Sequence, residues 1–407
     1  MSCKNESLCV TEGCGVTGTL LCSRCLNTFR DVVPHRRTFC VDLGSSTYAT
    51  SCVIRELESR SWTSAPQSSA KFIWLPFSKT NFDTILPSSI CGCHRVRTAL
   101  VRKDSFVKTA LLSGIKSMII PKSILISHGD TPEIRKAALS AIEGPWAIKE
   151  PLTNNAQGVR FASDSDALEI AINAALTVSP HAAVVVQKYI INPHLYNKKK
   201  YHVRVNVLLL GHQWVYIHAD AVAHIACEEW SYVKGDNLND EKVLFQHLTN
   251  NLYQRQHKEY KREKHTLLLK DIFCIGSADF TKLFTNMSDQ IHAIFNTVLN
   301  QQQQREKRHK LLPFLTLPSA FEIFGFDFLV TNDDMQPVIL EINGGPALES
   351  AAWPDICQRV IKDTIDLVLL DSDDVSEDDS DSDSDSTGGV WRAAPIPSST
   401  SNWKRIR

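Results

Sequence analysis

The sequence lacks the features that would place a protein in a membrane or on an export route. Its 407 residues contain no apolar run that approaches the ~20 residues of a membrane-spanning helix. The opening residues, Met1 to Ser7, are too polar for a secretory signal. No internal repeat is present. We therefore expect a cytoplasmic protein with no membrane partner, whose 12 cysteines are thiols or metal ligands rather than disulfides.

Net charge is also nearly absent, but the charges are segregated along the chain. The total is −1, and residues 371–385 contain nine acids and no Lys or Arg. Without these nine acids the remaining residues carry a charge of +8. A basic body indicates an acidic partner: nucleic acid, an anionic membrane or an acidic polypeptide. Because the chain lacks interleaved aromatic and basic motifs, nucleic-acid binding is the less favoured alternative.

The two ends of the chain differ in composition from the part between them. Residues 1–60 are rich in cysteine and poor in helical periodicity, and Ser59 to Ser69 has the composition of a linker. From about residue 70 onward, strand and helix patterns alternate as in an α+β fold. The Asp/Ser tract after residue 370 cannot bury a core, so we expect residues 371–407 to form a disordered acidic tail.

The cysteine-rich segment contains a candidate zinc site. Its densest cluster is Cys9, Cys14, Cys22 and Cys25, of which only the last two have the spacing of a zinc knuckle. The segment is either a small zinc finger or a set of unrelated reduced cysteines, and the spacing does not decide between these alternatives.

Hydrophobic periodicity predicts several elements in the middle of the chain. The pattern at Tyr201 to Val207 alternates strictly, so His202, Arg204 and Asn206 share one face of a strand. Strands are also predicted at 146–149 and 182–187, and helices at 132–142, 165–176 and 356–370.

A β-hairpin near residue 330 carries the strongest functional signal. Its arms are Phe321 to Val330 and Val338 to Pro346, and residues 332–334 supply the turn. If the turn centres on Asp334, Asp327 lies directly across from Glu341. Side chains two apart on a strand share a face, so Asn343 joins them.

Facing carboxylates ~5 Å apart repel each other unless a cation lies between them. Their neighbours on that face are apolar, and both arms are too hydrophobic to leave one side of the hairpin in water. The arrangement is typical of an oxygen-ligand site for Mg²⁺. The alternative is an acidic hairpin whose charges are simply solvated.

Other polar positions fit a nucleotide site around this hairpin. Lys149 closes a strand before a glycine-containing loop, where its ammonium can face phosphates. The segment Gln187 to Ile190 follows a buried strand, so its backbone and amide groups can read an adenine edge while Tyr189 or Ile190 packs on the ring. Arg204 can point at a phosphate or a carboxylate.

Seven motifs in order resemble the tubulin–tyrosine ligase-like family over roughly residues 95–370. They are Val101–Asp104, Ile120–Ser123, Trp146–Lys149, Gln187–Ile190, His247–Asn250, Phe324–Asp327 and Leu340–Gly344. The resemblance implies an ATP-grasp fold with mixed and antiparallel sheets and helices. Its parts would be an N-terminal α/β part at 70–145, a central subdomain at 146–200 and a C-terminal subdomain with the metal site at 201–370.

The resemblance also implies an activity: ATP-dependent addition of an amino acid, tyrosine or glutamate, to tubulin or a similar acidic polypeptide through an acyl phosphate. A tubulin acceptor implies association with the cytoskeleton. The cofactors implied are ATP and Mg²⁺. The site residues implied are Asp327, Glu341 and Asn343 for Mg²⁺, Lys103, Lys149, Gln187, Lys188, Tyr189, Ile190 and Lys200 for ATP, and His202, Arg204, Thr249 and Asn250 near the reacting groups.

The chain departs from the family pattern at three positions. His202 replaces an acid in the usual Lys-Phe-Asp-x-Arg, while Ala219 and His224 align with two arginines that face substrate carboxylate or acyl phosphate. The loop after Lys149 keeps only Gly158 of a stretch that is normally richer in glycine. The alternative function is therefore a catalytically inactive family member that binds nucleotide, tubulin or both.

Overall fold

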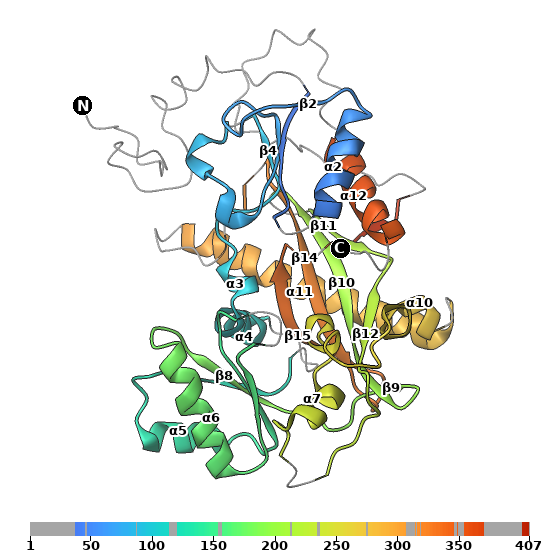
Figure 1. Cartoon of the computed structure of the whole chain (residues 1–407). Coiled ribbons are helices and arrows are strands. Elements are labelled where there is room, and N and C mark those ends of the chain that lie inside the picture. Colours follow the sequence, from blue (N-terminus) through green and yellow to red (C-terminus); the bar gives the residue numbers. More distant parts are fainter. Residues whose placement is uncertain are drawn as a thin grey trace, which may run out of the picture.

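The computed structural model describes residues 37–44, 47–86, 88–113, 120–153, 157–211, 214–233, 237–273, 276–306, 314, 316–317, 319–345, 348, 354–369 and 401–406. These residues form three β-sheets with helices packed on them (Figure 1). The expected α+β class is confirmed. None of the helices in the described ranges is long and apolar enough to cross a membrane.

The first sheet is parallel and has four strands in the order β2-β1-β3-β4. Its strands are β1 (Thr38–Val41), β2 (Thr63–Ser64), β3 (Phe72–Trp74) and β4 (Ile90–Cys91). Helix α2 (Thr47–Glu58) packs against α12 (Pro354–Leu369) beside this sheet. One apolar core, which includes Phe72, Val53 and Ile361, joins the sheet to both helices.

This sheet corrects two expectations about the start of the chain. β1 and α2 lie inside the segment predicted to be a separate cysteine-rich unit, and β2 lies inside the predicted linker. Trp62, beside β2, is buried in the core. Burial of this one aromatic residue therefore fixes the segment against the core, although the serines around it have the composition of a linker. The candidate zinc ligands Cys9, Cys14, Cys22 and Cys25 lie outside the described residues.

The second sheet is antiparallel, in the order β5-β8-β6-β7. Its strands are β5 (Ser123–Ile126), β6 (Trp146–Lys149), β7 (Val159–Ala162) and β8 (Val184–Lys188), and the helices are α5 (Pro132–Leu139) and α6 (Ser165–Val178). Asp164 caps α6 by accepting from the Ala167 N–H at 2.8 Å. The two predicted helices and the two predicted strands of this region are confirmed, with shifts of a few residues at their ends.

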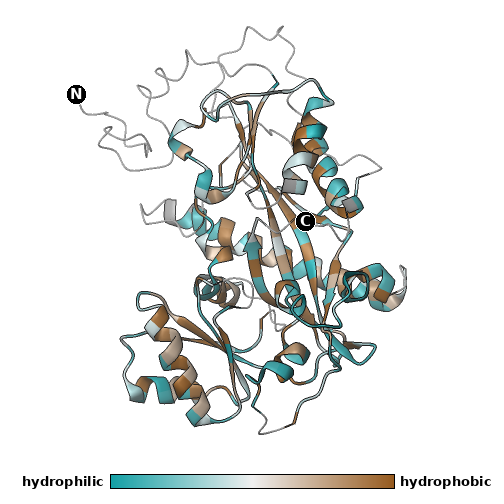
Figure 2. Ribbon diagram, in the orientation of Figure 1, coloured by the Kyte–Doolittle hydropathy of each residue, from teal (hydrophilic) through white to brown (hydrophobic). Residues whose placement is uncertain are grey.

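The third sheet has eight strands and forms the centre of the molecule (Figure 1). Its members are β9 (Leu195–Tyr196), β10 (Lys199–Leu210), β11 (Trp214–His218), β12 (Val222–Ile225), β13 (Thr266–Leu268), β14 (Phe321–Val330), β15 (Pro337–Gly344) and β16 (Trp403–Arg405). The predicted valines of β10 pack with β14 and with the long helix α11 (Ala278–Glu306). In Figure 2 the long central strands contain brown, hydrophobic stretches that are interrupted by teal, hydrophilic residues.

Short helices surround the central sheet. They are α3 (Thr98–Val101), α4 (Lys103–Leu112), α7 (Glu241–His247), α8 (Asn251–Gln254), α9 (Arg262–His265) and α10 (Leu269–Ile272), with 3-10 turns at Phe77–Lys79 and Phe82–Thr84. Helix α4 contacts β8, β15 and α11, so it bridges the second and third sheets.

The predicted hairpin is β14 and β15, and its register is the one expected. Asp327 pairs with Glu341, and a bulge follows between Asp327 and Phe328. Asp334 and Met335 make the turn with φ of 56° and 53°, a conformation favoured where a hairpin reverses tightly. Every residue of β14 is buried. Both faces of β14 are therefore covered, which excludes simple solvation of Asp327.

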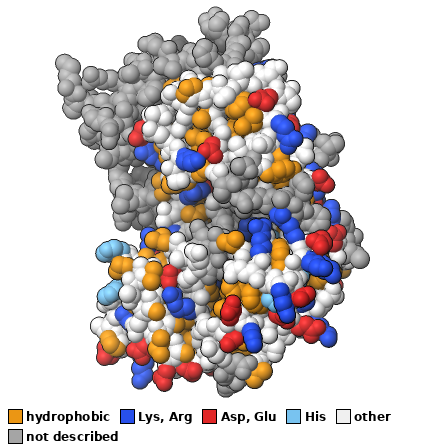
Figure 3. Space-filling view, in the orientation of Figure 1, with side chains coloured by type: hydrophobic (Ala, Val, Ile, Leu, Met, Phe, Trp, Pro, Cys, Tyr) orange, Lys and Arg blue, Asp and Glu red, His pale blue; other side chains and the backbone are white. Residues whose placement is uncertain are grey.

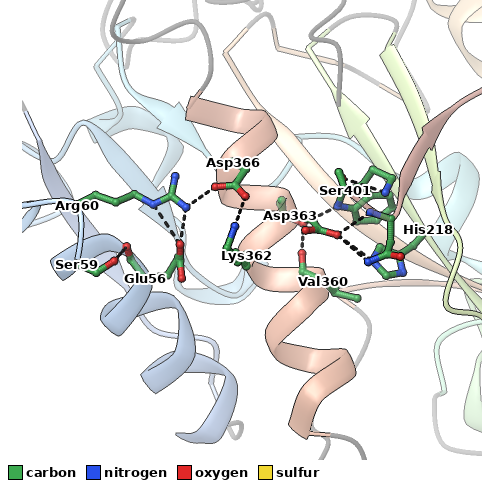
Figure 4. A network of polar contacts seen from close by, with 12 residues as sticks. Glu56, Ser59, Arg60, His218, Val360, Lys362, Asp363, Asp366 and Ser401 are labelled. Atoms are coloured by element: carbon green, nitrogen blue, oxygen red, sulfur yellow. Dashed lines mark hydrogen bonds and ion pairs between the residues drawn. The ribbon is translucent and has the colours of Figure 1, made fainter. Parts of the chain in front are cut away.

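The last residues of the chain correct the expectation of a disordered tail that reaches residue 407. β16 pairs with β11 at the edge of the central sheet, and Trp403 is buried in the core. The Asn402 N–H donates to the Asp363 carboxylate at 2.8 Å, and the Trp403 indole donates to Thr364 Oγ1 at 3.3 Å. Figure 4 shows Asp363 projecting from α12 toward Ser401 and His218, whose Nε2 lies 3.7 Å from the Asp363 carboxylate. Residues 370–400, which include the acidic tract, lie outside the described residues.

Candidate functional site

A cleft lies between the second sheet and the central sheet. It contains about 870 Å³ of empty space, part of it open to solvent, which suits a ligand of nucleotide size. Twelve of the fourteen described candidate residues line it, and the other two, Arg204 and Asn343, contact Asp327. The structure thus brings together candidate residues that are as far apart in the sequence as Lys103 and Asn343.

The acidic pair of the hairpin lies at one end of this cleft. Asp327 is buried, whereas the Glu341 side chain is 25% exposed. The Asn343 amide donates to Asp327 Oδ2 at 3.1 Å, so the predicted triad is contiguous. Asp327 also lies 3.8 Å from His202 Nε2.

Arg204 lies opposite Asp327 in the β10–β14 ladder. Its Nε and Nη2 groups donate to the two carboxylate oxygens of Asp327. The Nη2–Oδ2 distance is 2.7 Å, which is typical of a bidentate ion pair. Burial opposes the charge on the guanidinium, but the Asp327 and Glu341 carboxylates outweigh burial and raise the pKa of Arg204. Arg204 thus neutralises the carboxylate that sequence reasoning assigned to a metal.

Three lysines line the cleft. Lys103 Nζ lies 3.6 Å from Glu341 Oε2, and Lys149 Nζ donates to the Leu340 carbonyl at 3.2 Å. Lys200 Nζ donates to Tyr189 Oη at 3.0 Å and to the His247 carbonyl at 2.9 Å. Burial lowers the pKa of Lys149 to about 8 and that of Lys200 to about 7. Because an anion stabilises the protonated form of a nearby lysine, an anion bound in the cleft would raise both pKa values and keep Lys149 and Lys200 charged.

The opposite end of the cleft is apolar and aromatic. Tyr189 is buried, its ring lies 4.9 Å from that of Phe161, and its hydroxyl bonds to His247 Nδ1 at 2.6 Å. The backbone N–H groups of Lys188 and Tyr189 already donate to carbonyls within the fold. They therefore do not read an adenine edge in this arrangement, although the segment lines the cleft as predicted.

Sequence reasoning missed several residues of this apolar end. Ala147, Phe161, His247 and Leu329 line the cleft. Phe161 lies opposite Ala147 in the β6–β7 ladder, a pairing that requires the tertiary register. The sequence analysis included His247 only as the first residue of the motif His247–Asn250 and gave it no role.

Comparison with known proteins identifies the group to which this arrangement belongs. The model of the tubulin-tyrosine ligase family matches residues 100–377. The chain belongs to this family. A probable tubulin–tyrosine ligase of Schizosaccharomyces pombe is 24% identical over 68% of this chain and 76% of its own length.

Other relatives are longer than the part they share with the chain. A tubulin glycylase of Tetrahymena thermophila is 25% identical over 57% of this chain and 19% of its own length. A probable human tubulin polyglutamylase is 27% identical over 72% of the chain and 49% of its own length. The chain thus spans half or less of these two relatives.

A solved structure confirms the ATP-grasp fold. The C-terminal domain of K. lactis Pby1, described as an ATP-grasp enzyme, superimposes with a TM-score of 0.64. Its sequence is 17% identical, and the match covers 91% of this chain and 98% of that domain.

Two of the positions expected to depart from the family pattern lie next to each other in the central sheet. His202 and His224 face each other in the β10–β12 ladder, with ring centroids 4.9 Å apart. His202 Nδ1 bonds to Thr249 Oγ1 at 2.6 Å. Burial, followed by neighbouring positive charge, lowers the pKa of His202 to about 3 and that of His224 well below its usual range. Two neutral imidazoles therefore face each other on this part of the central sheet, and one of them, His202, lies beside Asp327.

Two further candidates have local structural partners. Ala219 lies between β11 and β12, and its N–H donates to the Asn402 carbonyl at 2.9 Å. Asn250 caps α8 by accepting from the Leu252 N–H at 2.9 Å. Thr249 bonds to His202, so both polar side chains at the end of this motif already have partners within the fold.

The donor set of the hairpin fits Mg²⁺. Asp327 and Glu341 supply carboxylate oxygens and Asn343 an amide oxygen, which are hard ligands suited to this ion. No group of three or more His, Cys, Asp or Glu able to hold a metal occurs in the described ranges.

Proposed function

We propose that the protein is an ATP-dependent carboxylate–amine ligase that adds an amino acid, tyrosine or glutamate, to tubulin or a similar acidic polypeptide. The supporting observation is the convergence, in one cleft, of basic groups and a pair of carboxylates. Relatives named as tubulin ligases, glycylases and polyglutamylases support the same class of acceptor.

The proposed chemistry has two balanced steps. A substrate carboxylate oxygen attacks the γ-phosphorus of ATP and ADP leaves, which gives an acyl phosphate. The amine then attacks the acyl carbon, loses a proton and displaces phosphate. Mg²⁺ held by Asp327, Glu341 and Asn343 would neutralise phosphate charge.

The basic side chains would do the remaining electrostatic work. Lys103, Lys149 and Lys200 offset the charge of the bound phosphates, which is the main requirement of phosphoryl transfer. Arg204 holds Asp327 in place and lies near the reacting carboxylate.

The charge of the chain fits an acidic acceptor. Outside the acidic tract the chain carries +8, which favours encounter with an acidic peptide. A tubulin acceptor would place the protein in the cytoplasm at the cytoskeleton.

The Glu341→Gln substitution tests the metal assignment. It removes one charge at constant size, so ligation should be abolished while the melting temperature stays within a few degrees. Mass spectrometry of tubulin tails after incubation with ATP and amino acid measures the product. Asp334→Asn, at the exposed turn of the same hairpin, is the matched control. Retained ligation by Glu341→Gln would rule out the assignment.

A catalytically inactive family member that binds nucleotide, tubulin or both is the second candidate. Ala219 and His224 favour it, because alanine and a neutral imidazole do not supply the charge of two arginines. ADP release measured with purified tubulin and labelled tyrosine or glutamate separates the two functions: release coupled to label incorporation requires the ligase.

A further inference from the structure

A buried ion pair lies beside the end of β15, the strand that carries Glu341 and Asn343. Glu322 of β14 has a side chain that is 2% exposed, and Arg97, at the start of α3, donates to its Oε1. The His94 N–H donates to Glu322 Oε2 at 3.0 Å. Both oxygens of a buried carboxylate are therefore held by one short segment that is far away in the sequence, which is how a buried charge is stabilised.

Arg97 also packs against the backbone of β15. Gly344, the last residue of the strand, directly follows Asn343. A Cβ at Gly344 would lie 2.6 Å from Arg97 Nη1 and 2.9 Å from Val101 Cγ1, both too close for real contacts. The absence of a side chain at Gly344 is therefore what allows the guanidinium to approach the strand.

The contact lies where the two arms of the hairpin separate. The β14–β15 ladder ends at Gly344, and the Gly345 N–H adds one bond to the Ile323 carbonyl at 3.3 Å. Because this bond is longer than usual, the position of the strand end depends more on side-chain contacts. Arg97 supplies such a contact to both arms, to Glu322 of β14 and to Gly344 of β15.

The same segment carries a lysine to the acidic pair. Helix α3 contacts β15, and α4, which begins at Lys103, follows it closely along the chain. Lys103 Nζ lies 3.6 Å from Glu341 Oε2. The segment from Arg97 to Lys103 is thus fixed to β15 at Gly344 and at Glu341, and Asn343 lies between these two points.

The first sheet supports Arg97 from its other side. The Arg97 guanidinium carbon lies 4.5 Å from the centroid of the Phe77 ring. Cys91 of β4 forms a bridge with Ala320, and its N–H donates to the Ser319 carbonyl at 3.0 Å, just before β14 begins. Figure 3 shows acidic, basic and hydrophobic side chains interspersed on the face over this sheet. The first sheet therefore reaches the metal end of the cleft through internal contacts, not through a basic patch on that face.

We propose that Arg97 is a positioning residue for the metal end of the cleft. Together with Glu322 it holds the end of β15 against β14, so that Glu341 and Asn343 keep their places beside Asp327. Arg97 does not itself line the cleft in the part of the chain that the structure describes, so it acts through the strand. The inference rests on the proposed function, because the ion concerned is the Mg²⁺ that binds with ATP.

Binding of a non-hydrolysable ATP analogue to the full chain, measured by calorimetry over a Mg²⁺ series and in EDTA, tests this role. The double variant Arg97→Met/Glu322→Gln removes both charges, keeps an acceptor for the His94 N–H and leaves no unpaired buried charge. The Mg²⁺ concentration that gives half of the increase in analogue affinity should rise about 10-fold, as for other residues that orient metal ligands. The affinity in EDTA, where no metal is bound, should be unchanged.

Three further variants locate the effect. Arg97→Lys keeps a positive charge beside Glu322 and should recover part of the Mg²⁺ response. Gly344→Ala places a methyl group where the guanidinium lies, so it should reproduce the loss and tests the contact independently of the ion pair. The matched control, Arg95→Met/Asp83→Asn, removes an exposed ion pair of 3.4 Å in the same part of the chain and should change neither affinity.

The outcomes separate this inference from the proposed function. If the unmutated chain and the Arg97 and Gly344 variants respond alike to Mg²⁺, the positioning role is wrong and the metal site stands. Equal losses with Mg²⁺ and in EDTA would also contradict the role, because they indicate a general loss of structure. If the unmutated chain binds the analogue no better with Mg²⁺ than in EDTA, or does not bind it, both proposals fall.

Discussion

Arg204 and Asp327 show how single residues balance the charge of the cleft. The guanidinium holds both oxygens of a carboxylate that was expected to be a metal ligand. Lys103 similarly lies beside Glu341. An ion bound at this hairpin would share its ligands with these cations, so phosphate groups that draw the cations away should strengthen ion binding.

Lys200 provides a prediction at the scale of one residue. Its pKa is lowered to about 7, mainly by burial, whereas an unfolded lysine titrates near ~10.4. Between these pH values the unfolded chain holds a proton that the folded chain lacks, so the free energy of unfolding rises with pH. The rise should reach up to ~1.4 kcal/mol per pH unit.

Denaturant titrations from pH 6 to 9.5 measure this dependence. Relative to Lys200→Met, which cannot titrate, the unmutated protein should gain stability as pH rises through about 7. Parallel curves for the two proteins would show that Lys200 is not the source.

At the scale of elements, the described ends of the β6–β7 connection are held in place, and one of them contacts a lysine of the cleft. Lys103 Nζ bonds to the Thr153 carbonyl, and Arg160 binds Glu150 at 2.6 Å. Gly158 has φ of 67°, and a Cβ there would lie 2.5 Å from Glu150 Oε2. The retained glycine is thus required by both backbone conformation and space.

Gly158→Ala should therefore disturb this loop. The left-handed backbone alone costs about 1–2 kcal/mol for a residue with a Cβ. We expect weaker ATP binding, measured by calorimetry, and a lower melting temperature. Gly129→Ala is the matched control, because a Cβ at Gly129 meets nothing within 4 Å. Equal effects of both substitutions would contradict the role of Gly158.

The edge strand β16 is a second element whose role can be tested. Trp403 is 2% exposed and packs edge-to-face on His218 with centroids 4.8 Å apart. Trp403→Ala should cost about 3–5 kcal/mol of unfolding free energy, as for other buried aromatic residues. Lys404→Ala, at the exposed neighbouring position, should cost less than ~0.5 kcal/mol in the same urea titration.

At the scale of the whole molecule, the segregation of charge suggests that the acidic tract mimics an acidic acceptor. Deletion of residues 371–385 changes the net charge from −1 to +8. We expect tighter binding of an acidic acceptor peptide and a steeper loss of affinity with salt, since more cations become available to the peptide. Unchanged affinity and salt dependence in an ionic-strength series would refute competition by the tract.

The residues that the sequence predicted well are those governed by local rules. The alternation of β10 and the spacing of the hairpin follow from the two-residue period of strands, so the Asp327–Glu341 register was predictable. Expectations based on composition were wrong where the burial of a single residue determines whether a segment is ordered. Trp62 and Trp403 each bury a large apolar surface inside a polar stretch, so segments that resembled a linker and a tail became strands.

By itself, the sequence determined the hairpin, the order of the motifs and the family, because each depends on neighbours along one chain. Only the tertiary structure decided which groups meet in the cleft. It paired Arg204 with Asp327 and placed the imidazole of His202 beside that of His224. These pairings depend on how three sheets pack together, and burial sets their charge states.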